Sequence, residues 1–305
     1  MSYTTVDRSN PTGNYDFEAC AQINEGEART ATRAGFDGLL QDAPGCSTSV
    51  VNGLSQQLIH QINVILPDAL VSFDDLDVEL EDAAFPFLQP PAKQALGQAI
   101  QERGIKMYIN SAYRTIAQQL LLYRWGSGCG YPVVASPGKS NHQSGLAIDI
   151  KEPDHWQPFL EKYGWRRLGS FDPPHFDYVG EGIKDIGSTA MLAIQKLWNK
   201  NHPNEKIGED GDYGSQTEDA LNRSPVMGFE IAPWDEKPRV LRLSRPMMEG
   251  SDVFKLQEAL KKGGLAVSSD GVFGAGTDKA VKEFQQKKSL TADGIVDSKT
   301  RVLMA

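Results

Sequence analysis

The stretch SNHQSGLAIDI, residues 140–150, places a histidine and an aspartate seven residues apart, on either side of a glycine and an apolar run. Gly145 allows a close backbone turn, so His142 can lie at the end of a loop while Asp149 projects from the strand that follows. A lone histidine–aspartate pair is usually structural. The stretch therefore predicts a loop and a strand, and only a further ligand would make it part of a metal site.

The stretch FDPPHFDY, residues 171–178, supplies that ligand. Two histidines and one carboxylate leave a position open for water, as a hydrolytic zinc requires, so His142, Asp149 and His175 predict a catalytic Zn²⁺ site. Asp172 lies three residues before His175, and two prolines limit the backbone between them. We expect Asp172 to exchange protons with the reacting water, although it could also be an ordinary turn aspartate.

A third candidate site residue comes from SAYRT, residues 111–115. Arg114 is expected at the end of a strand and before a helix, where its guanidinium could hold a carboxylate with two hydrogen bonds. Such a group suits a peptide with a free carboxyl end or an acidic side chain, but a surface salt bridge is the plainer alternative. Ser140 and Gln119 are further candidates for substrate binding.

The periodicity of apolar residues predicts an α+β domain that ends near residue 180. We expect a small antiparallel sheet with flanking helices, and a long glycine- and proline-rich loop at 126–138. The expected helices cover 53–65, 92–103, 116–123 and 156–163, and the expected strands cover 105–113, 144–150, 164–168 and 175–179.

Beyond residue 180 the sequence repeats itself. EDGDYGSQTEDAL begins at Glu209, SDGVFGAGTDKAV at Ser269, and a degenerate ADGIVDSKTRVLM at Ala292. Each copy has Asp-Gly and then a threonine seven residues after that aspartate, which predicts a tight turn and a threonine that caps the next helix. The segment is expected to be all-α. A recurrent helical motif without a ligand is the alternative interpretation.

We therefore predict four parts. They are an N-terminal arm of unknown role at 1–52, a zinc peptidase domain at 53–180, a diverged binding-like segment at 181–235 and a three-helix domain at 236–305.

Composition narrows the classes of partner. The 305 residues carry a net charge of −9, and no basic cluster is interleaved with aromatics, so nucleic acid is not an expected partner. Neither a signal peptide nor a run of about 18 apolar residues is visible. The three cysteines do not form a zinc-binding pattern, and we leave a Cys20–Cys46 bridge open. A monomer is expected.

Taken together, SAYRT, ASPGKSNHQSGLAIDI and DPPHFDY, within residues 105–180, resemble the VanY-type zinc D-alanyl-D-alanine carboxypeptidases and related peptidoglycan endopeptidases. The resemblance implies zinc held by His142, Asp149 and His175, a general base at Asp172 and substrate contact by Arg114. One departure matters. The family commonly has a glutamate before a Trp-His pair, whereas Asp-Pro-Pro-His here is more similar to the L-alanyl-D-glutamate endopeptidase branch.

Residues 249–303 resemble a small peptidoglycan-binding domain, and residues 197–221 resemble a diverged or incomplete copy of it. Both resemblances imply the same polymer, and hence action at the cell envelope or outside the cell. The expected function is zinc-dependent hydrolysis of peptidoglycan stem peptides, favoured as D-alanyl-D-alanine carboxypeptidase activity. The alternatives are an L-alanyl-D-glutamate endopeptidase acting as a phage-type or delivered lysin, and an inactive wall-binding protein.

Overall fold

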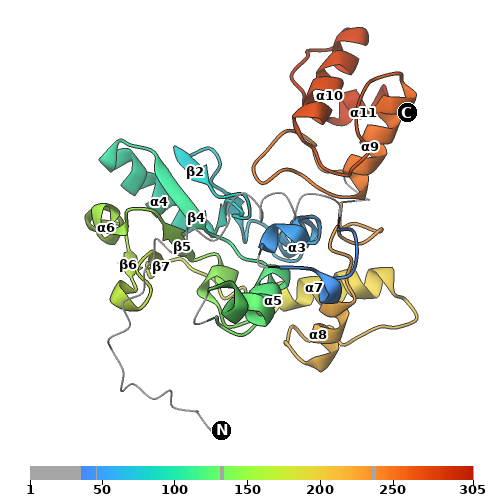
Figure 1. Ribbon diagram of the computed structural model, residues 1–305. Helices are drawn as coiled ribbons and strands as arrows, with labels where there is room; N and C mark the ends of the chain where they lie inside the picture. The colour runs from blue at the N-terminus through green and yellow to red at the C-terminus, as the bar shows by residue number, and fades with distance from the viewer. Residues whose placement is uncertain (1–35, 46, 131–133, 235–237, 305) are drawn as a thin grey trace.

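The computed structural model describes residues 36–45, 47–130, 134–234 and 238–304. A mixed α/β body surrounds one main sheet, and the C-terminal helices form a separate lobe at one end of it (Figure 1). Most of the predicted N-terminal arm lies outside the described residues. Short 3-10 helices cover Leu40–Asp42, Thr48–Val51, Gly126–Cys129, Asn141–Ser144 and Gly169–Phe171.

The main sheet has five strands in the order β2-β4-β5-β7-β6. They are β2 (Val78–Leu80), β4 (Met107–Ser111), β5 (Ala147–Ile150), β6 (Trp165–Arg167) and β7 (His175–Tyr178). The last four lie within the predicted strands. A separate antiparallel pair joins β1 (Val71–Ser72) to β3 (Phe87–Leu88).

The prediction of a wholly antiparallel sheet is wrong at one edge, where β2 pairs with β4 in parallel. Helix α4 (Pro90–Arg103) lies between these two strands in the chain. A helical crossover carries the chain back to the end of the sheet where it started, which is what parallel pairing requires. The other three strand pairs are antiparallel.

The two faces of the sheet differ because successive side chains point to opposite sides. Ile109, Ile148 and Phe176 are buried in a core that α4 and α6 (Pro153–Lys162) complete. The alternate positions form what we call the polar face, which consists of Glu79, Tyr108, Ser111, Asp149, Lys151, His175 and Asp177.

A second core joins helices that are distant in the sequence. It is formed by α3 (Asn52–Ile65), α5 (Ile116–Trp125), α7 (Gly187–Asn201) and α8 (Ser215–Asn222), together with loop residues up to Phe229. The predicted domain boundaries at 52/53, 180/181 and 235/236 stay predictions. The second core contains residues from both sides of the predicted boundaries at 52/53 and 180/181.

The repeated phrase forms the same hydrogen-bond network three times. In each copy a buried glutamine of the preceding helix donates to the aspartate and the threonine, and accepts from the glycine N–H; the glutamines are Gln195, Gln257 and Gln285. Each aspartate also accepts from the backbone two residues on, which confirms the tight turn.

The predicted capping role of the threonine is wrong. Gly214 and Gly274 occupy the N-cap positions of α8 and α10 (Ala275–Lys287), and Asp297 caps α11 (Ser298–Val302) with its side chain. The threonines lie inside the first turn and are buried by the glutamine network.

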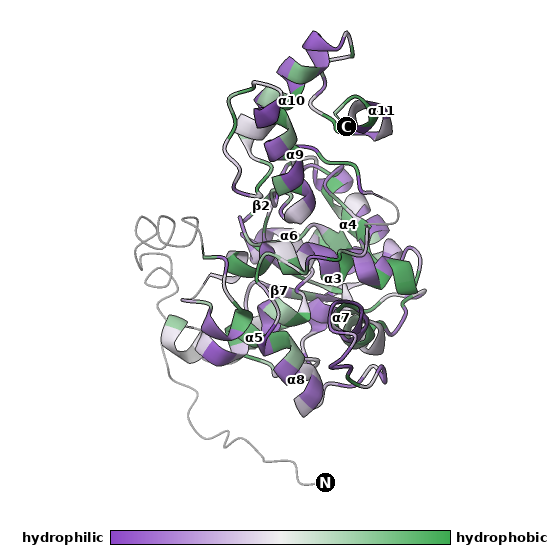
Figure 2. Ribbon diagram, turned by 90° about the vertical axis from the view of Figure 1, so that its right-hand side faces the viewer, coloured by the Kyte–Doolittle hydropathy of each residue, from purple (hydrophilic) through white to green (hydrophobic). Residues whose placement is uncertain are grey.

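The C-terminal lobe contains α9 (Ser251–Lys262), α10 and α11, so the all-α prediction is confirmed there. Purple and green residues lie side by side on α9 and α10 (Figure 2), as expected for amphipathic helices around the small core of Leu256, Val281 and Phe284. The lobe contacts α3, because Gln56 Nε2 donates to the Met247 carbonyl (2.6 Å).

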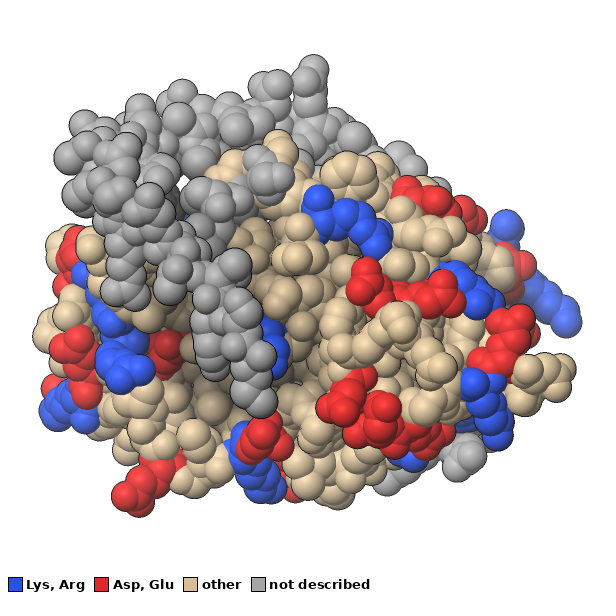
Figure 3. All heavy atoms as spheres, turned by 90° about the horizontal axis from the view of Figure 1, so that it is seen from below, with Lys and Arg blue, Asp and Glu red and all other residues tan. Residues whose placement is uncertain are grey.

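The surface seen from below mixes acidic and basic side chains without a continuous basic patch on its uncovered part (Figure 3). Among the described residues, no helix has the length and apolar character that a membrane crossing needs. Cys129 is disulfide-bonded, and its partner lies outside the described residues. The Cys20–Cys46 bridge left open by the sequence involves residues outside the described ranges.

Candidate metal centre on the polar face

His142 is placed by the 3-10 turn Asn141–Ser144, which Gly145 ends in the left-handed region (φ 69°). A Cβ at Gly145 would meet Leu70 Cδ2 at 2.7 Å, so the glycine is required by both conformation and space. The His142 ring is 4% exposed, and its Nδ1 is 2.8 Å from the Ala112 carbonyl. As the N–H donor in that bond, Nδ1 leaves Nε2 unprotonated and able to bind a metal.

Asp149 and His175 are direct partners across β5 and β7. Asp149 Oδ2 is 3.2 Å from His142 Nε2, and Asp149 Oδ1 is 3.0 Å from His175 Nδ1. The two imidazole rings meet edge to face with their centroids 5.0 Å apart. The carboxylate thus lies between the two histidines, and the structure brings together the three ligands predicted from the sequence.

Asp177 is a site residue that the sequence analysis missed. Its Oδ1 lies 2.9 Å from His175 Nε2 and accepts from Asn141 Nδ2 at 3.0 Å. Nε2 of His175 therefore faces the carboxylate of Asp177, and Nδ1 faces the carboxylate of Asp149. A histidine oriented in this way by an outer carboxylate is typical of metal-binding histidines.

The ligand atoms of His142, Asp149 and His175 all lie within 4.8 Å of one another. Zinc binds nitrogen and oxygen at about 2.0–2.2 Å, so two ligands of one ion lie less than about 4.4 Å apart. The donor set and the outer hydrogen bonds to Ala112 and Asp177 therefore fit a zinc ion.

The electrostatics of the site also favour a cation. Burial alone lowers the pKa of His175, but its hydrogen bonds to Asp149 and Asp177 raise this pKa to about 10. Burial raises the pKa of Asp149, yet the neighbouring His142 and His175 outweigh this effect and hold the pKa well below its usual range. The two carboxylates therefore stabilise positive charge at the position that a metal ion would take.

Arg114 lies beside this cluster, with Nη2 3.8 Å from Asp149 Oδ2. Ser111 Oγ accepts from Nη2 at 3.1 Å, and Gln119 Oε1 accepts from Nη1 at 3.2 Å. Gln119 is fully buried and donates in turn to the Ala135 carbonyl (2.6 Å), in the long loop after α5. Gln119 thus positions the guanidinium and the loop relative to each other.

The remaining predicted residues are Asp172 and Ser140. Burial raises the pKa of Asp172, and so does the negative charge of Asp149, while His175, His142 and Arg114 oppose the shift. These effects place Asp172 within the electrostatic reach of the cluster. Ser140 precedes the 3-10 turn and accepts from Gln143 N through its carbonyl.

Comparison with known families agrees with this geometry. Residues 90–167 match the family model for D-alanyl-D-alanine carboxypeptidase, VanY, a span that includes Arg114, His142 and Asp149. The chain carries a VanY-type domain. Residues 249–304 match the model for a putative peptidoglycan binding domain. The VanY match ends before Asp172 and His175, and the structure brings His175 to the site through β7.

Curated relatives are similar over part of the chain. A probable N-acetylmuramoyl-L-alanine amidase of Bacillus licheniformis is 34% identical over 106 residues, 32% of this chain and 30% of that protein. A spore cortex-lytic enzyme of Bacillus cereus is 43% identical over 56 residues, 18% of this chain and 22% of that enzyme. The chain thus spans less than a third of the length of these relatives.

One similar solved structure is that of the LdcB LD-carboxypeptidase, which was reported to reveal the molecular basis of peptidoglycan recognition. Its sequence is 23% identical to this chain, and the TM-score is 0.31. The match covers 43% of this chain and 75% of that one.

Proposed function

We propose that the protein hydrolyses peptidoglycan stem peptides in a zinc-dependent reaction, and that its main activity is that of a D-alanyl-D-alanine carboxypeptidase. The observation that carries the proposal is the cluster of His142, Asp149 and His175 next to Arg114. A bound zinc supplies Lewis-acid polarisation of the amide carbonyl and a lowered pKa for water.

The chain's own residues supply the other steps. Arg114 would bind the terminal carboxylate of the stem peptide, held in place by Ser111 and Gln119. Asp172 would take a proton from the attacking water and return it to the leaving amine. The scissile C–N bond then breaks, and the two products are a shortened peptide and a free D-alanine.

A carboxypeptidase also needs a wall beyond the last substrate residue. The loop between α5 and His142 is suited to form it, because it is fixed at two points in its second half. Ala135 accepts from Gln119, and the Gly138 N–H donates to Gln143 Oε1 at 2.9 Å. A wall formed by this loop would favour release of a single terminal residue over cleavage within a chain.

A second candidate is L-alanyl-D-glutamate endopeptidase activity, as in a phage-type or delivered lysin. The segment Asp172-Pro173-Pro174-His175 favours it, since it departs from the glutamate and tryptophan expected of the carboxypeptidases. Zinc ligands and base would be the same in both reactions. Peptidoglycan is the proposed partner in either case, with the residues that match the peptidoglycan-binding model holding the protein on the insoluble polymer.

The metal content of the purified protein distinguishes the proposed zinc-dependent hydrolase from an inactive wall-binding protein. We expect about one zinc per chain by elemental analysis, and loss of peptide hydrolysis on chelation with recovery on adding zinc. A protein without transition metal whose peptide hydrolysis is indifferent to chelators would contradict the zinc-dependent reaction.

A further inference from the structure

The C-terminal lobe docks on helix α3 of the body through the side chain of Gln56. Gln56 Nε2 donates to the Met247 carbonyl at 2.6 Å. Gln56 Oε1 accepts from Arg239 Nη1 at 2.7 Å and from the Glu249 N–H at 3.0 Å. The amide of one glutamine thus holds three residues of the segment that leads into α9.

Arg239 is an integral part of the lobe. Its guanidinium donates to both oxygens of the Asp252 carboxylate, at 2.8 and 3.0 Å, and its carbonyl accepts from Arg301 Nη2. The side chains of Arg239 and Asp252 are only 10% and 13% exposed. Because a planar guanidinium matches a carboxylate with two parallel bonds, Asp252 fixes the orientation of Arg239 within the lobe.

The same guanidinium also stacks on a tryptophan of the body. It lies 3.7 Å from the centroid of the Trp234 ring, which meets His60 of α3 edge to face with the centroids 5.4 Å apart. A Cβ added at Gly250 of the lobe would lie 3.8 Å from Trp234 Cζ2, so the backbone of the lobe is in contact with this ring. Tryptophan and arginine are the residue types that most often carry the binding energy of protein interfaces. Arg239 therefore joins the lobe to the body.

The docking point is next to a buried contact that leads to the substrate-binding arginine. Ser55, the neighbour of Gln56, shares a hydrogen bond of 2.8 Å between its Oγ and Thr115 Oγ1. Both side chains are buried. Thr115 caps helix α5 and directly follows Arg114. The lobe is thus joined by short contacts to the element that places Arg114.

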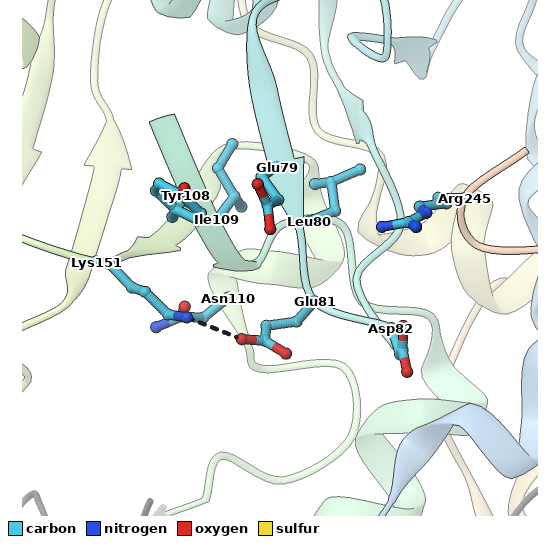
Figure 4. Close-up of a pocket in the computed structure, with 9 residues that line it drawn as sticks. All are labelled: Glu79, Leu80, Glu81, Asp82, Tyr108, Ile109, Asn110, Lys151 and Arg245. Carbon is cyan, nitrogen blue, oxygen red and sulfur yellow. Dashed lines mark ion pairs between the residues drawn. The ribbon is translucent and has the colours of Figure 1, made fainter. Parts of the chain in front are cut away.

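Opposite charges line the rim of this interface. Residues 73–85 of the body carry six carboxylates, and residues 238–250 of the lobe carry three arginines. Arg242 Nη2 lies 3.6 Å from Asp74 Oδ2. Such exposed pairs contribute little individually, but they favour approach in one orientation. Arg245 lines a pocket of about 300 Å³ at the β2 edge (Figure 4), together with the acidic residues Glu79, Glu81 and Asp82.

We propose that Arg239 and Gln56 hold the C-terminal lobe in one orientation on the body, and that this orientation directs the metal centre toward stem peptides of the wall to which the lobe is bound. The second half of the inference rests on the proposed function. A flexible tether raises only the local concentration of an enzyme, whereas a fixed lobe also determines which face of the enzyme meets the polymer. Arg239 and Gln56 are thus positioning residues for wall-bound substrate.

The variant Gln56→Lys tests the docking, because it replaces the acceptor of Arg239 by a second cation. Gln61→Lys is the matched control, since it adds the same charge to another partly buried glutamine of α3, roughly 140° around the helix axis. Energy transfer between dyes on noncanonical residues at Glu161 of α6 and Gln286 of α10, both exposed, reports the distance between body and lobe.

We expect one narrow distribution of transfer efficiencies in the wild type and in Gln61→Lys, and a broad distribution in Gln56→Lys. A broad distribution in the wild type would overturn the fixed orientation. A distribution that stays narrow in Gln56→Lys would overturn the role of Gln56 and Arg239.

The same proteins without dyes are then compared on soluble pentapeptide and on sacculi. Gln56→Lys should hydrolyse the soluble peptide and sediment with sacculi like the wild type, which shows that both parts are folded. It should release D-alanine from sacculi about 10-fold more slowly, because the bound lobe no longer orients the metal centre. Gln61→Lys should keep all three properties. If Gln56→Lys loses soluble hydrolysis or sedimentation, Gln56→Ala replaces it, since it removes the same hydrogen bonds without adding a charge.

The orienting role and the proposed function can fail separately. Release of D-alanine from sacculi by the undocked variant at the wild-type rate would overturn the orienting role and leave the hydrolase intact. If the wild type hydrolyses neither substrate, the proposed function fails. The energy-transfer distributions then decide the docking alone, with the same expected and contradicting results.

Discussion

At the scale of single residues, the hydrogen-bond partners of the two histidines determine which ring nitrogen faces the metal position. Ala112 engages Nδ1 of His142, and Asp177 engages Nε2 of His175. The two rings would therefore bind a metal through different nitrogens. Asp177 would thus orient the ring of His175 without touching the metal.

Replacement of Asp177 by alanine should lower zinc affinity by about 10- to 100-fold, because His175 loses the carboxylate that orients its ring. Competition with a chromophoric chelator measures this affinity. Asp42→Ala, at an exposed aspartate distant in the sequence from the site, is the control. An unchanged zinc affinity in Asp177→Ala would show that the strand alone orients His175.

Asp172→Asn should keep the fold and the zinc but lower kcat for the pentapeptide by roughly 10²- to 10⁴-fold, because the amide cannot accept the proton. Elemental analysis and circular dichroism report the retained metal and fold. A variant that turns over nearly as fast as the wild type would assign the proton transfer to another group.

The sequence predicts the ligands better than it predicts what surrounds them. His142, Asp149 and His175 stand in a recognisable order, so their chemistry can be read from spacing. The sequence could also have indicated Asp177. It lies two residues after His175 in a strand, and alternate side chains of a strand lie on the same face of the sheet. The role of Gln119 depends on its contacts with Arg114 and Ala135, which no local pattern reveals.

At the scale of elements, hydrophobic periodicity located α3 to α6 and β4 to β7 closely. The short strands β1 to β3 were not predicted, because two or three residues are too few to show alternation. The parallel pairing of β2 with β4 follows from the position of α4 in the chain rather than from either strand. The edge of the sheet formed by β2 is therefore the part least accessible to sequence analysis.

The repeat offers a matched test at this scale, since Gln195 and Gln257 make equivalent networks in different parts of the fold. Changing either to leucine leaves a buried glycine N–H unpaired and should destabilise its surroundings by about 1–3 kcal/mol. Gln195→Leu should reduce both the melting temperature and peptide hydrolysis. Gln257→Leu should weaken only the binding to sacculi. If the two variants reduced peptide hydrolysis equally, the assignment of the two networks to different parts of the fold would be wrong.

At the scale of the whole molecule, the first copy of the repeat does not belong with the other two. Helices α7 and α8 pack into the core with α3 and α5, whereas α9 to α11 have a core of their own. Similar sequence phrases therefore serve different parts of the structure. Sequence similarity reveals the shared turn, but only packing shows which core each copy completes.

Two truncations follow from this difference. A chain ending at residue 234 keeps the second core, so it should fold and hydrolyse soluble pentapeptide while no longer sedimenting with sacculi. A chain ending at residue 180 loses Ile194, Leu197 and Phe229 from that core and should not fold stably. Thermal melts and sacculus pull-downs measure both. A stable, active chain ending at 180 would contradict the shared core.

The most direct test of the central claim is mass spectrometry of a purified muropeptide with a pentapeptide stem after incubation with the zinc-loaded protein. The account predicts conversion of the pentapeptide to a tetrapeptide with free D-alanine as the co-product, and no conversion after chelation. Peptides that begin at D-glutamate, with L-alanine left on the glycan, would replace the carboxypeptidase by the endopeptidase. A stem peptide that stays intact with zinc present would contradict the account.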